Sequence, residues 1–414
     1  MCITILLAAL TVGRTAPSFD LLAACPGENC SRQMRIVWHS SSPECELAYA
    51  PADGSTRPTK AKVTKTRSPV AYTGEPTYWK YSATLEGLKP GSRYAYRVSA
   101  DGAHTSAQEF RTAGEDGEFC FLWMGDVHST PNKPKKMESV KLLFDNASEA
   151  SSALGGIDFV LFTGDAVKHG QTYACWREWN ASPPFAQRMM AAVCGNKEYY
   201  RDEGKTRWHN RWFLAARNNP PNGATGLEST YWFIYNGVLF IGIDTLAVEG
   251  REMGDSAVRA AREGQPEWFE KVAKAQRGRY RYLVAFQHYP YFSRKGPTGY
   301  GGYDRWRTVF DRCGVDFALS GDSHSYVRSK QIRGGKEDPN GTVYAVCPEI
   351  DGYLGEADVR SGEGLVAAYD AKDSSYGACW FSVGKESMTL HWLCNGTADI
   401  DTVTVKAKRR VQAR

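Results

Sequence analysis

The chain has 414 residues, which is enough for two or three domains with hydrophobic cores of their own. Hydrophobic residues make up 42% and charged residues 23%, which is typical of a folded globular protein and excludes a disordered or fibrous one. The formal net charge of +5 is too small to indicate nucleic-acid binding.

The first residues predict export from the cytoplasm. Residues 1–12 form an apolar run that is too short to span a bilayer, and we interpret residues 1–16 as a secretory signal peptide, although no positive charge precedes the run. The apolar residues that end at Cys25 also resemble a bacterial lipid-attachment box, but the polar residues 13–20 separate them from the first run. The sequence therefore predicts a secreted or periplasmic protein without a transmembrane segment, and a lipid anchor at Cys25 is the minor alternative.

Cysteine usage bears on the same question. Ten of the eleven cysteines remain after removal of the signal peptide, because only Cys2 precedes the cleavage region. Cys25, Cys30 and Cys45 crowd the start of the mature chain, and an oxidising compartment would favour a disulfide among them. No Cys-x-x-Cys pair occurs, so the sequence does not predict a structural zinc site.

Residues 25–114 predict a β-sandwich. Short runs that nearly alternate apolar and polar residues recur there without a helical period, and turn residues separate them. The predicted strands cover residues 34–39, 45–49, 78–85 and 93–98. Residues 85–98 resemble the corner of a fibronectin type III domain, in which a tyrosine at the start of the penultimate strand ties back to the preceding turn. His39 and His104 lie in this region and are interpreted as structural.

Residues 115–405 predict a second domain of the α/β (α+β) class with a largely buried sheet. A polar hinge at residues 113–117 precedes it, and residues 406–414 form a basic tail. Buried strands alternate with helical stretches, and Asn236-Gly237 joins two apolar runs as a hairpin turn. The predicted helices cover residues 137–153 and 266–275, and further strands cover residues 231–235, 238–244, 342–346, 376–383 and 388–393.

Five apolar runs in the second domain end in residues that can bind metal ions. Residues i and i+2 of an extended chain point the same way, so Asp126 and His128 can address one ion after the run at residues 119–124. Ligands collect at the carboxyl ends of strands in layered α/β proteins, and we therefore expect one metal site. The other four runs lead to Asp165, to Asn196, to His288, and to Asp322 with His324.

In this order the motifs resemble the blocks of the calcineurin-like metallophosphoesterases. With the sandwich in front, the chain is similar to the purple acid phosphatase branch over roughly residues 34–404. The blocks are Gly125-Asp126-Val127-His128, Gly164-Asp165, Gly195-Asn196-Lys197-Glu198, His288 and Gly321-Asp322-Ser323-His324. The resemblance implies a four-layer α/β/β/α fold for the second domain and a centre that holds two metal ions.

The resemblance also implies which residues hold these ions. Two cations about 3.5–4 Å apart can clamp a phosphate and activate water near neutral pH. Mixed oxygen and imidazole donors suit divalent or trivalent iron, manganese or zinc, and do not decide among them. The first ion would be held by Asp126, His128 and His324, the second by Asn196 and His288, and Asp165 would bridge the two.

Three positions depart from the purple acid phosphatase pattern. Lys168 stands where that branch has a tyrosine ligand, so the colour of the tyrosine–iron pair should be missing and His128 would supply the absent ligand. Lys197 replaces the histidine that assists the leaving group. Asp322 replaces the first histidine of the closing block.

The last two departures leave two interpretations open. In the first, Asp322 ligates the second ion and Lys197 grips a phosphate oxygen, which makes both residues catalytic candidates. In the second, Lys197 pairs with Asp322, its ammonium stands where the second ion would be, and the centre holds a single ion or is only weakly active. The number of ions bound per chain separates the two interpretations.

The sequence thus predicts an exported, acid-phosphatase-like phosphoesterase that hydrolyses phosphomonoesters by metal-activated water. Its partner would be a phosphorylated small molecule or polymer, and no nucleic-acid partner is expected. The alternative is a non-catalytic or weakly active protein that binds phosphate or a surface ligand and keeps a degenerate, mononuclear metal site.

Overall fold

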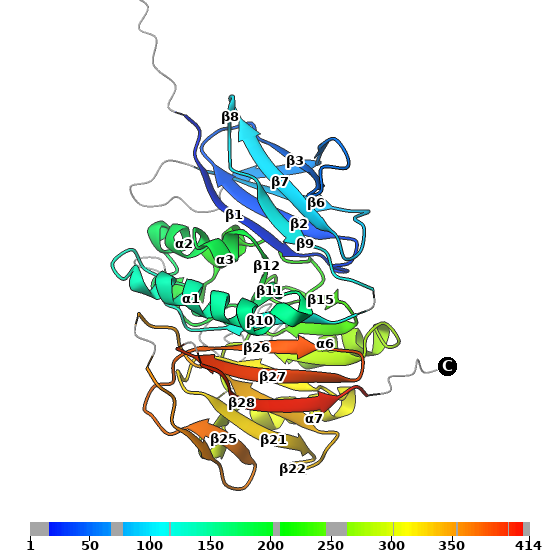
Figure 1. Cartoon of the computed structure of the whole chain (residues 1–414), viewed down its shortest axis with the longest axis vertical. Helices are drawn as coiled ribbons and strands as arrows, with labels where there is room; N and C mark the ends of the chain where they lie inside the picture. Colours follow the sequence, from blue (N-terminus) through cyan, green and yellow to red (C-terminus); the bar gives the residue numbers. More distant parts are fainter. Residues whose placement is uncertain are drawn as a thin grey trace, which may run out of the picture.

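The computed structural model describes residues 16–67, 78–115, 117–201, 208–245, 263–300, 302–352, 355–395 and 397–408. A β-sandwich, blue to cyan in Figure 1, lies at one end of the long axis, and an α/β domain makes up the remainder. Residues 1–15 of the predicted signal peptide and residues 409–414 of the predicted basic tail lie outside these ranges. Within the same ranges, no helix has the length and apolar character needed to cross a membrane.

The sandwich has the strands and the corner that the sequence predicts. β7 alternates buried and less buried residues and pairs with β3 in one sheet, while β2 and β6 pair in the other. The Tyr94 hydroxyl accepts a hydrogen bond of 2.9 Å from the backbone N–H of Lys89 in the preceding turn, as a fibronectin-like corner requires. The strands are β1 (Phe19–Pro26), β2 (Met34–Ser40), β3 (Glu46–Pro51), β4 (Thr59–Lys60), β5 (Val63–Arg67), β6 (Trp79–Leu85), β7 (Arg93–Ala100), β8 (Ala103–His104) and β9 (Gln108–Arg111).

Strand β1 was not predicted, because its apolar residues look like part of an export signal. Cleavage before Cys25 would remove most of β1, and the Cys25 side chain is fully buried. The expected disulfide among Cys25, Cys30 and Cys45 is wrong, since all ten cysteines in the described ranges are free thiols. Most of these cysteines are buried in apolar surroundings, where a free thiol packs like a small hydrophobic side chain.

One ten-stranded sheet passes through both domains. Its order is β28-β27-β26-β10-β11-β12-β1-β2-β6-β5, and β1 pairs in parallel with β12 at Ala24 and Met189. β1 thereby covers the β12 edge of the α/β domain, which would otherwise expose unpaired backbone groups. The sandwich is therefore joined to the second domain by backbone hydrogen bonding.

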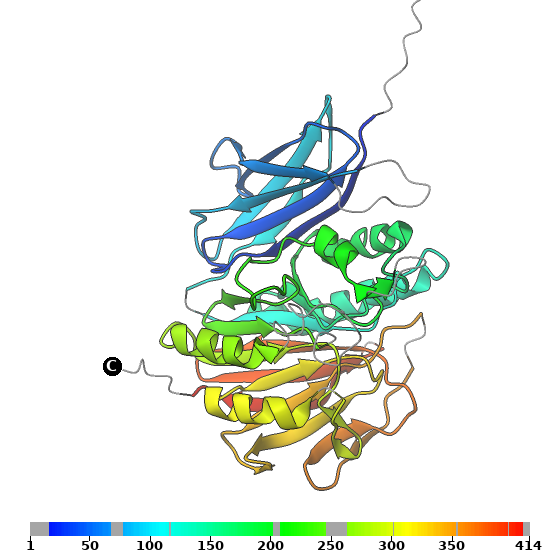
Figure 2. The same cartoon turned by 180° about the vertical axis from the view of Figure 1, so that it is seen from behind.

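The second domain has four layers, which confirms the predicted α/β/β/α architecture. α1 lies on the outer face of the first sheet in Figure 1, and α6 and α7 cover the second sheet in the reverse view of Figure 2. The helices are α1 (Lys135–Ala150), α2 (Tyr173–Asn180), α3 (Pro183–Ala186), α4 (Arg211–Ala216), α6 (Gln265–Ala275) and α7 (Tyr303–Cys313), with a short 3-10 turn at Ser152–Leu154.

The strands of this domain are mostly short and buried. Those of the first sheet are β10 (Phe119–Met124), β11 (Ile157–Phe162), β12 (Met189–Ala192), β26 (Ala378–Val383), β27 (Ser387–Cys394) and β28 (Thr397–Lys406). Those of the second are β15 (Tyr231–Tyr235), β16 (Val238–Gly242), β17 (Tyr282–Phe286), β20 (Phe317–Ser320), β21 (Val327–Arg333), β22 (Lys336–Glu337), β23 (Thr342–Val346), β24 (Val359–Ser361) and β25 (Val366–Asp370). Two small hairpins complete the set, β13 (Tyr200–Arg201) with β14 (Trp208–His209) and β18 (Phe292–Ser293) with β19 (Gly296–Pro297).

Aromatic residues fill the space between the two sheets. Phe159 of β11 meets Phe240 of β16 edge to face, with ring centroids 5.5 Å apart, and Phe381 of β26 meets Phe317 of β20 edge to face at 5.1 Å. These pairs add to the burial of apolar area and fix how the two sheets face each other. Because the sheets are held in this way, the loops at their carboxyl edges have fixed relative positions.

Candidate metal centre

Five loops that follow strand ends meet at one place. β10, β11 and β12 run parallel in the first sheet, and β17 and β20 run parallel in the second, so their carboxyl ends gather at one edge of the domain. Polar contacts of 3.6 Å or less connect all seven predicted ligands, with Lys197 linking Asn196 to the others. The seven residues are Asp126, His128, Asp165, Asn196, His288, Asp322 and His324.

Five of these residues have a left-handed backbone, which non-glycine residues rarely adopt. Such conformations persist only where the surrounding structure enforces them, and they concentrate at functional sites. Here backbone bonds from His128 N–H to the Asp165 carbonyl (2.9 Å) and from Asp126 N–H to the Gly164 carbonyl (3.0 Å) hold the loops together. The φ angles are 54° at Asp126, 50° at His128, 55° at Asp165, 68° at Asp322 and 52° at His324.

The loop after β12 is held tightly against the loop after β11. A Cβ atom on Gly195 would lie 2.2 Å from Asp165 Oδ1, so this approach requires glycine. The buried Glu198 carboxyl group accepts backbone N–H bonds from Asp165 (2.8 Å), Val167 (3.2 Å) and Gly195 (2.6 Å). The motif alone indicated no role for Glu198; its hydrogen bonds position two of the loops that carry candidate ligands.

One group of candidate ligands consists of Asp126, His128 and His324. Each offers one ligand atom, and these atoms all lie within 4.8 Å of one another. His324 Nε2 lies 3.6 Å from Asp126 Oδ1, and the Asp126 carboxylate also accepts the backbone N–H of Asp322 at 3.0 Å. His324 Nδ1 lies 2.9 Å from Glu349 Oε2. Glu349 follows β23 by a few residues and was not predicted from the sequence, although an acidic residue after another strand end was a usable signal.

A second group contains Asp126, Asp165 and His288, whose ligand atoms also lie within 4.8 Å of one another. Asp165 lies between the two groups, because its Oδ2 is 3.0 Å from His128 Nε2 and its Oδ1 is 3.4 Å from His288 Nε2. Asp322 Oδ1 approaches the same His288 nitrogen at 3.5 Å. The carboxylates of Asp165 and Asp322 therefore converge on one nitrogen of His288.

The surroundings of His288 show whether this arrangement fits a metal ion. Its Nδ1 lies 2.8 Å from the Thr163 carbonyl, which can only accept, so Nδ1 carries the proton. Nε2 is fully buried and faces the carboxylates of Asp165 and Asp322 at 3.4 and 3.5 Å. Two carboxylates that converge on one buried imidazole nitrogen need a positive charge between them, which a metal ion can supply in place of a proton, and the residues fit such an ion.

The pKa values of these groups reflect the three carboxylates that lie around His288. Burial by itself would lower the pKa of His288, but the carboxylates of Asp165, Asp126 and Asp322 raise it to about 10. Burial raises the pKa of Asp126 to about 7, an effect that His288 partly offsets. Burial would also raise the pKa of Asp165, but His288 and His128 hold it well below its usual range. A proton on His288 thus supplies the charge that a metal ion would otherwise bring.

Lys197 lies against two of the candidate ligands. Its Nζ is 3.0 Å from Asn196 Oδ1 and 3.5 Å from Asp165 Oδ2, and its backbone N–H donates to Asp165 Oδ1 at 2.8 Å. The second interpretation of the sequence paired this lysine with Asp322, whereas the structure places its ammonium next to Asp165 and Asn196. Asp322 remains directed toward His288.

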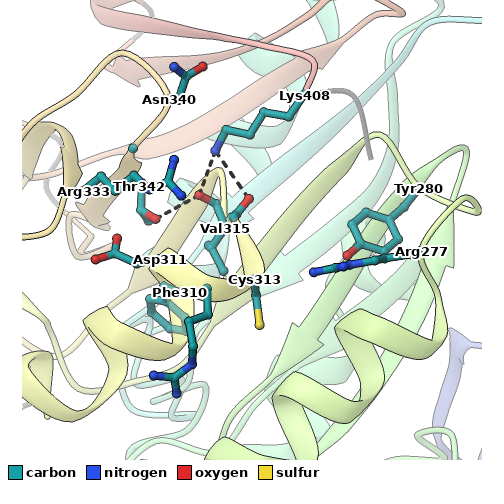
Figure 3. A pocket seen from close by; sticks show the side chains of 13 residues that line it. Arg277, Tyr280, Phe310, Asp311, Cys313, Val315, Arg333, Asn340, Thr342 and Lys408 are labelled. Atoms are coloured by element: carbon teal, nitrogen blue, oxygen red, sulfur yellow. Dashed lines mark hydrogen bonds between the residues drawn. The ribbon is translucent and has the colours of Figure 1, made fainter. Parts of the chain in front are cut away.

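The cavity in Figure 3 is a different place. It has a volume of about 400 Å³ and lies beside Val315, before β20, whereas Asp322 follows the other end of that strand. Two of its basic residues already have acidic partners, since Lys408 Nζ lies 3.0 Å from Asp316 Oδ1 and Arg312 pairs with Glu270. None of the seven candidate ligands is among the residues that line this cavity.

Comparison with known proteins supports this description. Residues 120–326 match the family model for calcineurin-like phosphoesterases, and residues 23–112 match that for the N-terminal domain of purple acid phosphatases. The fold is similar to purple acid phosphatase PPD1 from yellow lupin (Lupinus luteus) seeds, with a TM-score of 0.71, 15% identity, and coverage of 94% of this chain and 74% of that one. It is also similar to PhoD, with a TM-score of 0.61, 11% identity, and coverage of 94% and 90%.

Proposed function

Because the chain belongs to the calcineurin-like phosphoesterase family and is therefore a phosphoester hydrolase, we propose that it hydrolyses phosphomonoesters outside the cytoplasm. The observation that carries the proposal is the buried His288 Nε2, which lies 3.4 Å from an Asp165 oxygen and 3.5 Å from an Asp322 oxygen. Such a nitrogen is suited to binding a cation. The family implies divalent metal ions, and the donor set here suits iron, manganese or zinc.

The residues divide into two sets around Asp165. Asp126, His128 and His324 would hold one ion, and Asn196, His288 and Asp322 would hold the other. When bound, the two ions polarise the phosphate and activate water for in-line attack. Thr163 fixes the tautomer of His288 from behind, and Glu349 orients His324.

The charges at the site favour a monoester over a diester. A terminal phosphate carries up to two negative charges near neutral pH and exposes three oxygens, whereas a diester carries one charge and exposes two. Lys197 is 35% exposed beside the ligands and can grip one phosphate oxygen as the charge shifts to the leaving group. A monoester makes fuller use of two cations and an ammonium.

The test is turnover of an aryl phosphomonoester and the matching aryl diester. The purified protein is stripped with a chelator and reloaded separately with Mn²⁺, Fe²⁺ and Zn²⁺. We expect metal-dependent hydrolysis that prefers the monoester. The variant His288→Asn should lose more than the roughly 10- to 100-fold that loss of a residue behind the ligands costs, whereas His104→Gln, in the exposed part of the sandwich, should be unchanged.

The rival function is a non-catalytic or weakly active protein that binds a phosphorylated or surface ligand. The position of Lys197 against Asn196 and Asp165 favours it, because an ammonium there competes with a second ion. Absence of turnover with every metal, together with retained binding of inorganic phosphate, would support the binding protein and reject the proposed hydrolysis.

A further inference from the structure

We propose that Lys197 is a tethered cation that competes with the second metal ion, so that the centre binds one ion tightly and the other weakly. The proposal rests on the proposed function, since it assigns a property to the same centre. It also gives Lys197 two positions, one against the ligands when the second ion is absent and one on the substrate phosphate when that ion is bound.

The contacts of the ammonium carry the first step. Lys197 Nζ donates to Asn196 Oδ1 at 3.0 Å and lies 3.5 Å from Asp165 Oδ2. Asn196 would bind only the second ion, and Asp165 would bind both. A metal ion sits about 2.0–2.2 Å from a ligand oxygen, so an ion on Asn196 and this ammonium would be close neighbours of like charge. The second ion must therefore displace the lysine before it can use both oxygens.

In the part of the chain that the structure describes, the first set meets the ammonium only at the shared Asp165, where Lys197 Nζ lies 3.5 Å from Oδ2, the oxygen that faces His128. The ion-pair partner of Asp126 there is His324, and His324 Nδ1 is engaged by Glu349. Lys136, the basic residue that affects His128 electrostatically, has Asp351 at 3.7 Å. An ion in the first set thus meets the ammonium at one shared oxygen, whereas an ion in the second set meets it at Asn196 as well, which makes the two sites unequal.

Displacement is feasible because Lys197 is held only at its tip and backbone. Its side chain is 35% exposed, whereas the Asp165 and His288 side chains are 2% and 0% exposed. Asp322, which is 18% exposed, stays opposite His288 when the lysine leaves and completes the second set. The released ammonium remains tethered next to the ions, where a phosphate would bind.

This arrangement predicts opposite effects of one substitution on two measurements. In Lys197→Gln the competing charge is gone, so the second ion should bind about tenfold more tightly or better, while the first ion should bind as before. Turnover at saturating metal should fall by about tenfold or more, because the phosphate loses its ammonium contact. A lysine with only a structural role would not tighten metal binding.

The experiment is calorimetric titration of the chelator-stripped, full-length protein with Mn²⁺. The control is Lys168→Gln, which removes the same charge from an exposed residue three positions after Asp165. We expect two classes of site in the wild type and in Lys168→Gln, and a selectively tighter weak class in Lys197→Gln. Lys197→Met serves as a second neutral variant should the glutamine variant fail to fold.

Equal or weaker binding of the second ion in both neutral variants would overturn the proposal. One ion per chain in the wild type and also in both variants would overturn it as well, because no second site would exist to compete for. One ion in the wild type and two in Lys197→Gln would support it. Inactivity toward the aryl phosphate, with tightening still present, would reject the proposed hydrolysis and leave this inference standing.

Discussion

At the scale of single residues, Asp165 organises the centre. Both of its oxygens face nitrogen groups, His128 and Lys197 on one side and His288 on the other. Its backbone is left-handed, and Glu198 holds its N–H. Its backbone conformation and its hydrogen bonds thus fix its position before any ion binds, as a preorganised ligand requires.

Glu198 should matter for stability as well as for activity. In Glu198→Gln one carboxyl oxygen becomes an amide that faces backbone N–H donors, which leaves buried donors without acceptors. We expect the metal-free protein to lose about 1–3 kcal/mol of unfolding free energy in urea. Glu118→Gln, at an exposed position, is the matched control and should change by less than about 0.5 kcal/mol. Equal stability of both variants would show that Glu198 does not hold the loops.

His39 predicts how stability depends on pH. It is fully buried, its Nε2 donates to the Ala215 carbonyl at 3.0 Å, and its Nδ1 has no partner. Burial lowers its pKa from 6.5 to about 4. Between these two pH values His39 is protonated in the unfolded chain but stays neutral in the folded chain. The free energy of unfolding therefore falls as the pH drops from 6.5 toward 4.

Removing this histidine should flatten that part of the pH dependence. In His39→Gln the amide can still donate to Ala215 but does not titrate. The difference in unfolding free energy between wild type and variant should change by up to about 3 kcal/mol between neutral pH and about pH 4. Urea unfolding at several pH values measures it, and parallel profiles for the two proteins would refute the assignment of a neutral His39.

At the scale of elements, the loop after α4 fastens the sandwich to the second domain. Arg35 of β2 donates to the Asn218 carbonyl and to Asn218 Oδ1, both at 2.9 Å. The Asn218 amide donates back to the Ile36 carbonyl at 3.0 Å. Lys80 of β6 donates to the Leu214 carbonyl at 2.7 Å, near the carboxyl end of the helix.

Asn218→Ala should loosen this junction. It removes the acceptor of Arg35 and the donor to β2 at a half-buried position, so we expect a loss of about 2 kcal/mol. The centre lies elsewhere, and metal content should not change. Asn340→Ala, at an exposed turn, is the control. Thermal unfolding of both variants measures the effect, and equal midpoints would show that the hydrogen bonds of Asn218 do not stabilise the junction.

Some of these elements could be predicted from the sequence, and others could not. The five strand ends could be predicted, because apolar runs that stop at polar residues leave a clear pattern and parallel strands end at one edge. The Asn236-Gly237 hairpin is confirmed, with φ angles of 42° and 75° at the turn. The pairing of β1 with β12 could not be predicted, because it joins Ala24 to Met189 across a long stretch of chain.

The sequence predicted which residues make up the site, but not which of their side chains contact one another. The motif residues do come together, but their spacing could not show that Lys197 approaches Asn196 and Asp165 while Asp322 turns to His288. Glu349 was missed because its link to His324 exists only in the folded chain. Contacts between side chains from separate loops depend on tertiary packing, which local sequence does not encode.

At the scale of the whole molecule, the centre stores unfavourable charge that bound metal would relieve. Asp126, Asp165 and His288 are all buried and converge from both sheets. Chelation should therefore lower the midpoint of thermal unfolding, and added Mn²⁺ should restore it. The free energy of unfolding should rise with the logarithm of the Mn²⁺ concentration, by about 2.7 kcal/mol at a hundredfold excess over the dissociation constant. A midpoint that ignores both chelator and metal would contradict metal binding by the folded state.

The most direct test of the account is anomalous X-ray diffraction from crystals of the full chain soaked in excess Mn²⁺. We expect two anomalous peaks about 3.5–4 Å apart. One should lie among Asp126, His128 and His324 and the other beside His288 and Asp322, with Asp165 between them. A well-ordered crystal without a peak at these residues, or with manganese bound only elsewhere, would contradict it.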